Sequence, residues 1–76
     1  MASTTATQLA ERRAALGITQ AHIAELIRIG RVNICRWETG AQAIPPRRAK
    51  QLDAVLSTLE VGYRAARAVA GEAGQR

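Results

Sequence analysis

Hydrophobic residues recur at intervals of three and four along most of the chain, which is the spacing of one face of an α-helix. Breaks in this pattern fall at Gly17, around Gly30, and between Gly40 and Pro46. Four helices are therefore predicted, over about residues 5–16, 19–26, 31–39 and 46–70. Few β-branched runs and no Asn-Gly or Asp-Gly turn occur, so the predicted fold class is all-α.

The predicted helices begin and end at residues that favour helix ends. Thr5 and Gln8 have the spacing of a capping box, and Thr19 is a favourable N-cap. Pro46 suits the first turn of the last helix. Gly17 suits the left-handed position that often follows a helix.

Residues 27–30 alone separate the second and third predicted helices. Two short helices joined so closely must cross at a steep angle, which is the helix-turn-helix arrangement. Leu52 and Leu56 of the last helix are expected to close the core formed by this pair. The core residues expected from the pair are Ile23, Ala24, Ile27, Ile34 and Trp37.

The outward side of the third predicted helix is basic. Arginine can make a two-pronged contact with guanine, and a valine side chain can meet the methyl group of thymine. We therefore expect this side to read bases in the DNA major groove, whereas the alternative is that its arginines only solvate an exposed helix. The predicted base contacts are Arg31, Val32, Asn33 and Arg36.

The composition of the chain favours a polyanionic partner. Its 76 residues are enough for one small domain, and 11 Lys and Arg against 6 Asp and Glu give a formal net charge of +5. A charge of this sign and density is typical of proteins that bind nucleic acid. The alternative is a protein that merely avoids zero net charge.

The stretch TQAHIAELIRIGRVNICRWETG, residues 19–40, resembles the helix-turn-helix core of the Cro/C1-type repressor family. The family pattern reads Gln, two residues, Leu-Ala, a turn, Ile-Ser, an aromatic or apolar residue, Glu and Gly. The resemblance covers roughly residues 9–56 and implies a compact, lambda-repressor-like domain, here with a long fourth helix. The matching positions are Gln20, Ile23-Ala24, the turn at Arg28-Ile29-Gly30, Ile34-Cys35, Trp37-Glu38 and Gly40.

The resemblance also implies roles for single residues. In the family, the Gln that opens the second helix contacts a backbone phosphate, which assigns Gln20, and the helix start at Thr19 is expected to assist it. A first-helix arginine often pairs with the Glu near the end of the third helix, which implies a structural ion pair between Arg13 and Glu38. The remaining expected phosphate contacts are Arg28, Arg47 and Arg48.

Two residues depart from the family pattern. Arg28 stands where the turn usually has Gly, and a non-Gly residue in a left-handed conformation costs on the order of 1 kcal/mol. Gly30 stands where the helix cap is usually Ser or Thr, at a cost of a few tenths of a kcal/mol. Both costs are small, so the helix-turn-helix prediction stands.

The last predicted helix has more apolar surface than so small a core can cover. Leu52, Leu56, Leu59, Tyr63, Ala66 and Ala70 follow a heptad pattern. Because nothing in the chain is left to cover this stripe beyond about Glu60, a second copy is the expected partner. The alternative is a fraying, Ala-rich tail. The expected dimer contacts are Leu59, Gly62, Tyr63, Ala66, Val69 and Ala70.

Three segments are expected: a mobile N-terminus over residues 1–4, the DNA-binding domain over 5–60, and a dimerising helix extension with a mobile tail over 61–76. No signal-peptide pattern or membrane-length apolar run occurs, so we expect a cytoplasmic protein with no membrane partner. His22 and Cys35 cannot form a metal site by themselves, and Cys35 is expected to be a small half-buried filler rather than a redox switch.

No paired carboxylates, nucleophile triad or phosphate-binding glycine loop occurs, so neither catalysis nor a cofactor is expected. The predicted function is a dimeric, sequence-specific regulator of a phage or operon that binds an inverted repeat in double-stranded DNA and acts as a repressor or autoregulator. Two alternatives stay open. One is an antitoxin that binds a protein toxin through the last helix, and the other is an adaptor that binds nucleic acid without sequence preference.

Overall fold

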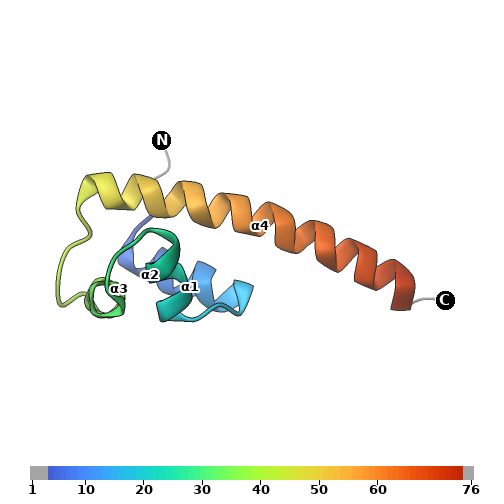
Figure 1. The fold of residues 1–76 in the computed structure, drawn as a ribbon, viewed down its shortest axis with the longest axis horizontal. Coiled ribbons are helices and arrows are strands. Elements are labelled where there is room, and N and C mark those ends of the chain that lie inside the picture. The colour runs from blue at the N-terminus through green and yellow to red at the C-terminus, as the bar shows by residue number, and fades with distance from the viewer. Residues whose placement is uncertain (1–3, 75–76) are drawn as a thin grey trace.

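A computed structural model describes residues 4–74 of the chain, in which helices joined by turns and loops occur and no strand (Figure 1). This confirms the predicted all-α fold with a long fourth helix. The helices are α1 (Ala6–Leu16), α2 (Gln20–Leu26), α3 (Arg31–Thr39) and α4 (Pro46–Gly74).

A single hydrophobic core joins the four helices. The first half of α4 lies across α1–α3, while α1 packs against α3 and α4, and α2 against α3. Five leucine and isoleucine side chains have no exposed surface, and each such burial stabilises the fold by roughly 1.5–3 kcal/mol. They are Leu9, Ile23, Ile34, Leu52 and Leu56. The core cluster is Leu9, Ile23, Ala24, Ile27, Ile34, Trp37, Leu52 and Leu56.

The three short helices α1–α3 and the first half of α4 form the body of the domain, and the second half of α4 extends beyond this body (Figure 1). The described part of the chain measures 48 × 25 × 20 Å, and the long dimension follows α4. Every residue from 61 to 70 is exposed, including Val61 at 63% and Val69 at 67%. A helix of this length is therefore only half covered by its own chain.

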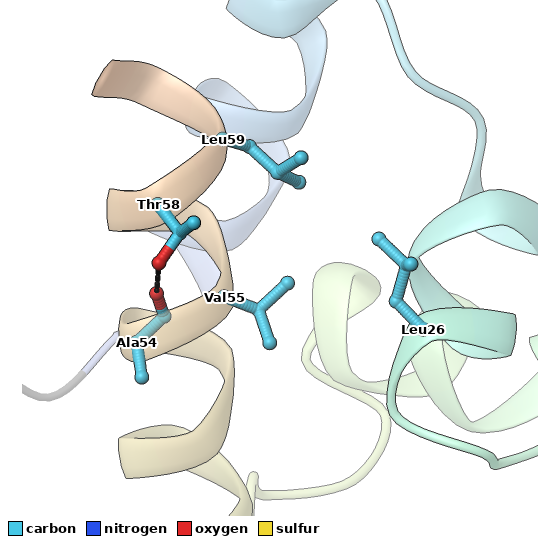
Figure 2. Close-up of a pocket in the computed structure, with 5 residues that line it drawn as sticks. All are labelled: Leu26, Ala54, Val55, Thr58 and Leu59. Carbon is cyan, nitrogen blue, oxygen red and sulfur yellow. Dashed lines mark hydrogen bonds between the residues drawn. The ribbon is translucent and has the colours of Figure 1, made fainter. Parts of the chain in front are cut away.

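A groove opens between α2 and α4. Figure 2 shows Leu26 of α2 facing Val55 and Leu59 of α4, and the space has a volume of about 350 Å³. Leu26 is 45% exposed, so the groove leaves apolar side chains in contact with water. A second hollow continues along α4; it is lined by Leu16, Ile18, Thr58, Leu59, Gly62 and Tyr63.

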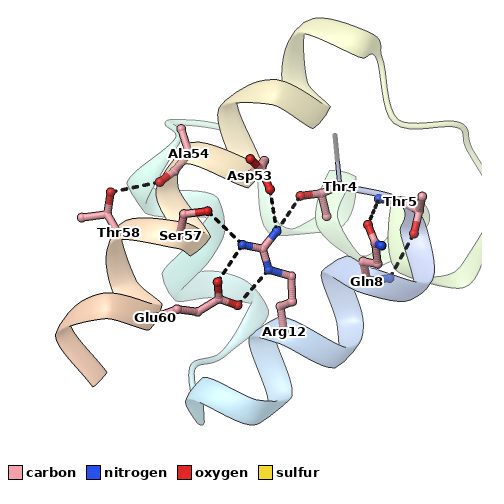
Figure 3. Close-up of polar contacts among 9 residues, drawn as sticks. All are labelled: Thr4, Thr5, Gln8, Arg12, Asp53, Ala54, Ser57, Thr58 and Glu60. Atoms are coloured by element: carbon pink, nitrogen blue, oxygen red, sulfur yellow. Dashed lines mark hydrogen bonds and ion pairs between the residues drawn. The ribbon is translucent and has the colours of Figure 1, made fainter. Parts of the chain in front are cut away.

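Local chemistry fixes the helix ends where the sequence predicts them. At the start of α1, Gln8 N donates to Thr5 Oγ1 at 3.2 Å and Thr5 N donates to Gln8 Oε1 at 3.1 Å, which completes the capping box (Figure 3). Gly17 and Gly40 follow α1 and α3 with φ of 71° and 79°, in the left-handed region that glycine adopts at little cost.

Thr4 and the end of α4 form the two ends of the described chain. Thr4 is buried, and its hydroxyl accepts a hydrogen bond from Arg12 Nη1 at 3.2 Å. The last helix continues to Gly74, past the predicted end near Ala70, because no proline interrupts its backbone hydrogen bonding. The expectations for residues 1–3 and 75–76 lie outside the described residues.

Candidate nucleic-acid interface

The turn between α2 and α3 is held by its own backbone. Ile29 N donates to Ala24 O at 3.0 Å, and Arg28 N donates to Glu25 O at 3.1 Å. Arg28 has a φ of 58°, the one positive φ of a non-glycine residue in the described chain. Gly30 then adopts an extended conformation as N-cap of α3, without a side chain to cap it. This turn sets the angle at which α3 leaves α2.

Two buried side chains determine which side of α3 faces outward. Ile34 is fully buried and Trp37 is 4% exposed, so both anchor α3 to the core. Arg31 and Arg36 are exposed, and Val32 is 50% exposed. The outward side of α3 thus carries the guanidinium groups of Arg31 and Arg36 and the apolar side chain of Val32.

Asn33 lies at the margin of this side. It is half-buried, and its Nδ2 donates to Gly30 O at 3.4 Å, which holds the amide near the start of α3. The amide keeps further hydrogen-bonding capacity for a base edge.

The structure brings Arg13 of α1 and Glu38 of α3 together in a two-pronged ion pair. Arg13 Nε donates to Glu38 Oε2 at 2.7 Å, and Nη2 donates to Oε1 at 2.9 Å. Arg13 Nη1 also donates to Ile18 O at 2.8 Å. The Glu38 side chain is 7% exposed, so this pair joins α1 to the end of α3 in a largely buried place.

Gln20 links that pair to the outward side of α3. Its Nε2 donates to Glu38 Oε1 at 3.0 Å, and its Oε1 accepts from Arg31 Nη1 at 3.4 Å. A phosphate contact was predicted for Gln20 from the sequence, whereas its bond to Glu38 was not. Burial alone raises the pKa of Glu38, but the hydrogen bonds from Arg13 and Gln20 outweigh it and lower that pKa below the ordinary value.

The other residues predicted to contact phosphate have different surroundings. Thr19 Oγ1 accepts from His22 N at 3.0 Å and so caps α2. Arg48 is half-buried, and its Nη1 donates to Ile27 O at 3.3 Å and to Gln51 Oε1 at 2.8 Å, which ties the start of α4 to the turn. Arg28 and Arg47 are exposed.

A comparison of the sequence with models of known protein families identifies the family of this chain. A model described as a helix-turn-helix domain matches residues 6–68, which is most of the chain. The chain belongs to this helix-turn-helix family. The match is consistent with the Cro/C1-type resemblance of residues 19–40. No match was found among curated proteins or among solved structures.

Membership of a helix-turn-helix family indicates a DNA-binding regulator. No helix within the described residues is both long enough and apolar enough to span a lipid bilayer. The same residues contain no group of three or more His, Cys, Asp or Glu side chains placed to hold a metal ion. His22 is exposed and Cys35 is half-buried.

A cluster around Arg12 was missed by sequence reasoning (Figure 3). Arg12 Nε and Nη2 donate to the two carboxylate oxygens of Glu60 at 2.8 and 2.7 Å, and Nη1 donates to Asp53 Oδ1 at 2.8 Å. Ser57 Oγ accepts a further bond from Nη2 at 3.2 Å. Asp53 and Glu60 are seven residues apart, so they share one side of α4, and this spacing was the available signal.

Three of the acidic side chains are paired with Arg12 and Arg13, so they do not neutralise the arginines on the outward side. Arg12 and Arg13 hold Asp53, Glu60 and Glu38. The Arg12 hydrogen bond lowers the pKa of Glu60 against the opposing effect of burial. Within residues 4–70, no ion pair involves the remaining arginines of the helix-turn-helix side, so their charge is free for an anionic partner. These are Arg28, Arg31, Arg36, Arg47 and Arg48.

Proposed function

We propose that this protein regulates transcription by binding a specific sequence of double-stranded DNA through α3. The observation that carries the proposal is the outward side of α3, where Arg31, Val32 and Arg36 are exposed beside a buried Ile34 and Trp37. A helix fixed in this way can enter the major groove with its first residues at the base edges. Asn33 is the fourth proposed base contact.

The proposed backbone contacts surround α3. Arg28 in the turn and Arg47 at the start of α4 are exposed and form no ion pair with any described residue, which supports contacts with phosphate. Gln20 and Arg48 are proposed to reach phosphate while keeping part of their internal bonding, and the backbone at Thr19 is proposed to assist through the N-terminus of α2.

We further propose that the protein binds as a homodimer to an inverted repeat and acts as a repressor or autoregulator. The uncovered second half of α4 supports a second copy, since residues 61–70 are all exposed. The proposed contacts include Leu59, which is half-buried beside the core, and five exposed residues further along the helix. These are Gly62, Tyr63, Ala66, Val69 and Ala70.

Selection of bound duplexes from a random library, at about physiological salt, tests the proposal. An enriched inverted repeat with half-sites roughly one helical turn, or about 34 Å, apart is the expected result. A single asymmetric site would support base recognition by α3 but contradict the symmetric dimer. No enrichment, with binding that vanishes as salt rises, would favour the adaptor function instead.

The antitoxin alternative uses the same exposed half of α4 for a protein toxin. Purified protein that has twice the 8.2 kDa monomer mass would assign this surface to a second copy. A monomer that binds DNA singly would leave the surface for a different protein.

A further inference from the structure

We propose that two copies pair through antiparallel α4 helices, with the two-fold axis at Gly62 and the second half of each helix seated in the partner's groove between α2 and α4. This inference rests on the proposed function, because it describes the geometry of the proposed DNA-binding dimer. The surface involved is an apolar stripe along α4, here named the α4 stripe: Val55, Leu59, Gly62, Ala66 and Val69.

The α4 stripe has the spacing of a helix-pairing seam. Its members are four, three, four and three residues apart, so they follow one another along one side of the helix. The four charged residues between positions 53 and 70 lie on other sides of α4, so pairing along the stripe would not bury a charge. They are Asp53, Glu60, Arg64 and Arg67.

The α4 stripe is symmetric about Gly62. Val55 and Val69 are each seven residues from it, so an antiparallel two-fold axis at Gly62 places Val55 of one copy opposite Val69 of the partner subunit. The same axis places Leu59 opposite the partner's Ala65 and Ala66, which leave room for a leucine. A Cβ built at Gly62 meets nothing within 4 Å in the single copy, so the backbones can approach closely at the axis.

The groove between α2 and α4 is the surface that the partner's α4 stripe is proposed to cover. Leu26 forms the wall opposite Val55 and Leu59, and no side chain among the described residues fills the space between them (Figure 2). Antiparallel pairing lays the second half of the partner's α4, with Ala66 and Val69, over this space. Parallel pairing would set groove against groove and leave both unfilled, which forfeits the dispersion contacts of their walls.

The position of the body relative to the stripe gives an independent reason for the antiparallel orientation. Leu52 and Leu56 point into the body, and at roughly 100° of rotation per residue the stripe lies about a quarter turn away from them. A partner on the stripe therefore lies beside α4. A two-fold axis perpendicular to α4 then leaves both bodies on the same side of the helix pair, whereas an axis parallel to α4 puts them on opposite sides. Only the first arrangement lets both α3 helices meet one duplex.

Light scattering of two matched variants tests the role of the axis. Gly62→Leu adds a bulky side chain at the proposed axis, at a position where a Cβ meets no atom of the described single copy within 4 Å. Ala68→Leu makes a similar addition on another exposed side of α4. At tens of micromolar, we expect the wild type and Ala68→Leu to have the dimer mass and Gly62→Leu the monomer mass, all with the same helical circular dichroism. A dimeric Gly62→Leu, or a monomeric wild type, would overturn the proposal.

Cross-linking in a Cys35→Ser background tests the orientation. Antiparallel pairing brings position 58 next to the partner's position 66, so oxidation of a mixture of Thr58→Cys and Ala66→Cys proteins should join one to the other. It also separates the two copies of position 69 by roughly 21 Å, too far for a disulfide between Val69→Cys copies. A Val69→Cys disulfide without the mixed one would show parallel pairing and overturn the inference.

These results separate this inference from the proposed function. Enrichment of an inverted repeat without the antiparallel cross-link would leave the function standing and contradict this dimer. An antiparallel dimer that enriches no duplex sequence would support this dimer and contradict the proposed function.

Discussion

Glu38 connects the interior of the domain to its outward arginines. It accepts from Arg13 on one side and from Gln20 on the other, and Gln20 in turn accepts from Arg31. Hydrogen bonds to ionised groups are the stronger ones, so this chain of bonds orients α3 and one of its proposed base contacts together.

The lowered pKa of Glu38 makes part of the stability depend on pH. A carboxyl group whose pKa is lower in the folded state stabilises the fold above its ordinary pKa of 4.5, and this contribution is lost as the pH falls through the folded-state value. We expect Glu38→Gln to lower the unfolding free energy by roughly 1–3 kcal/mol near neutral pH. In urea unfolding, the difference from the wild type should shrink below the ordinary pKa.

The exposed Glu25→Gln on α2 is the matched control, because Glu25 makes no ion pair within the described residues. A difference between wild type and Glu38→Gln that stays constant with pH would contradict the role given to the ionised carboxylate.

Arg47 should contribute to affinity without contributing to specificity. Because it is proposed to contact phosphate, Arg47→Ala should weaken selected and random duplexes by the same factor and reduce the salt slope by about 1 for each subunit that is bound. Fluorescence anisotropy at several salt concentrations measures both effects. Arg64→Ala, on the half of α4 away from the turn, is the control and should change neither quantity.

At this scale, the sequence predicted residues whose roles depend on local pattern or on a family motif. Arg13 and Glu38 are 25 positions apart, and the family resemblance, not their spacing, implied that they meet. The Arg12 cluster was missed because its geometry depends on how α4 is rotated against α1. The bond from Gln20 to Glu38 was missed for the same kind of reason.

Among the elements, the turn between α2 and α3 contains a residue whose type does not suit its backbone conformation. Arg28 occupies the left-handed region with a φ of 58°, where glycine is favoured. We expect Arg28→Gly to be more stable to thermal unfolding than Arg28→Ala by about 1 kcal/mol, since only glycine relieves the backbone.

Both Arg28 variants lose the same charge, so both should bind DNA more weakly than the wild type and equally so. Equal stability of the two variants would contradict the strain at this turn. Unchanged DNA binding by both would remove Arg28 from the proposed phosphate contacts.

The helix boundaries were predictable because their causes are local. The capping box at Thr5, the cap at Thr19 and the glycines after α1 and α3 each act within a few residues. The end of α4 was predicted too early, since alanine-rich sequence continues a helix without any local stop signal.

For the whole molecule, the half-buried Arg12 and Arg13 bind carboxylates, whereas among the described residues the arginines of the helix-turn-helix side form no ion pair, so unpaired positive charge gathers on that side. If a dimer neutralises about 6 to 10 phosphates, its affinity should fall roughly 10³ to 10⁵ fold between 50 and 200 mM salt. The monomeric Gly62→Leu variant makes half as many contacts, so its logarithmic salt slope should be about half as steep. Equal slopes would mean that only one copy touches the duplex.

The central claim is that the outward side of α3 reads bases. Its most direct test is selection from a random duplex library with the wild type and Arg36→Ala in parallel. The claim predicts an inverted repeat for the wild type. For the variant it predicts the same repeat with preference lost at one symmetric pair of positions, and a loss of affinity of about 1–3 kcal/mol for each half-site. An unchanged repeat for the variant, or no repeat for the wild type, would contradict it.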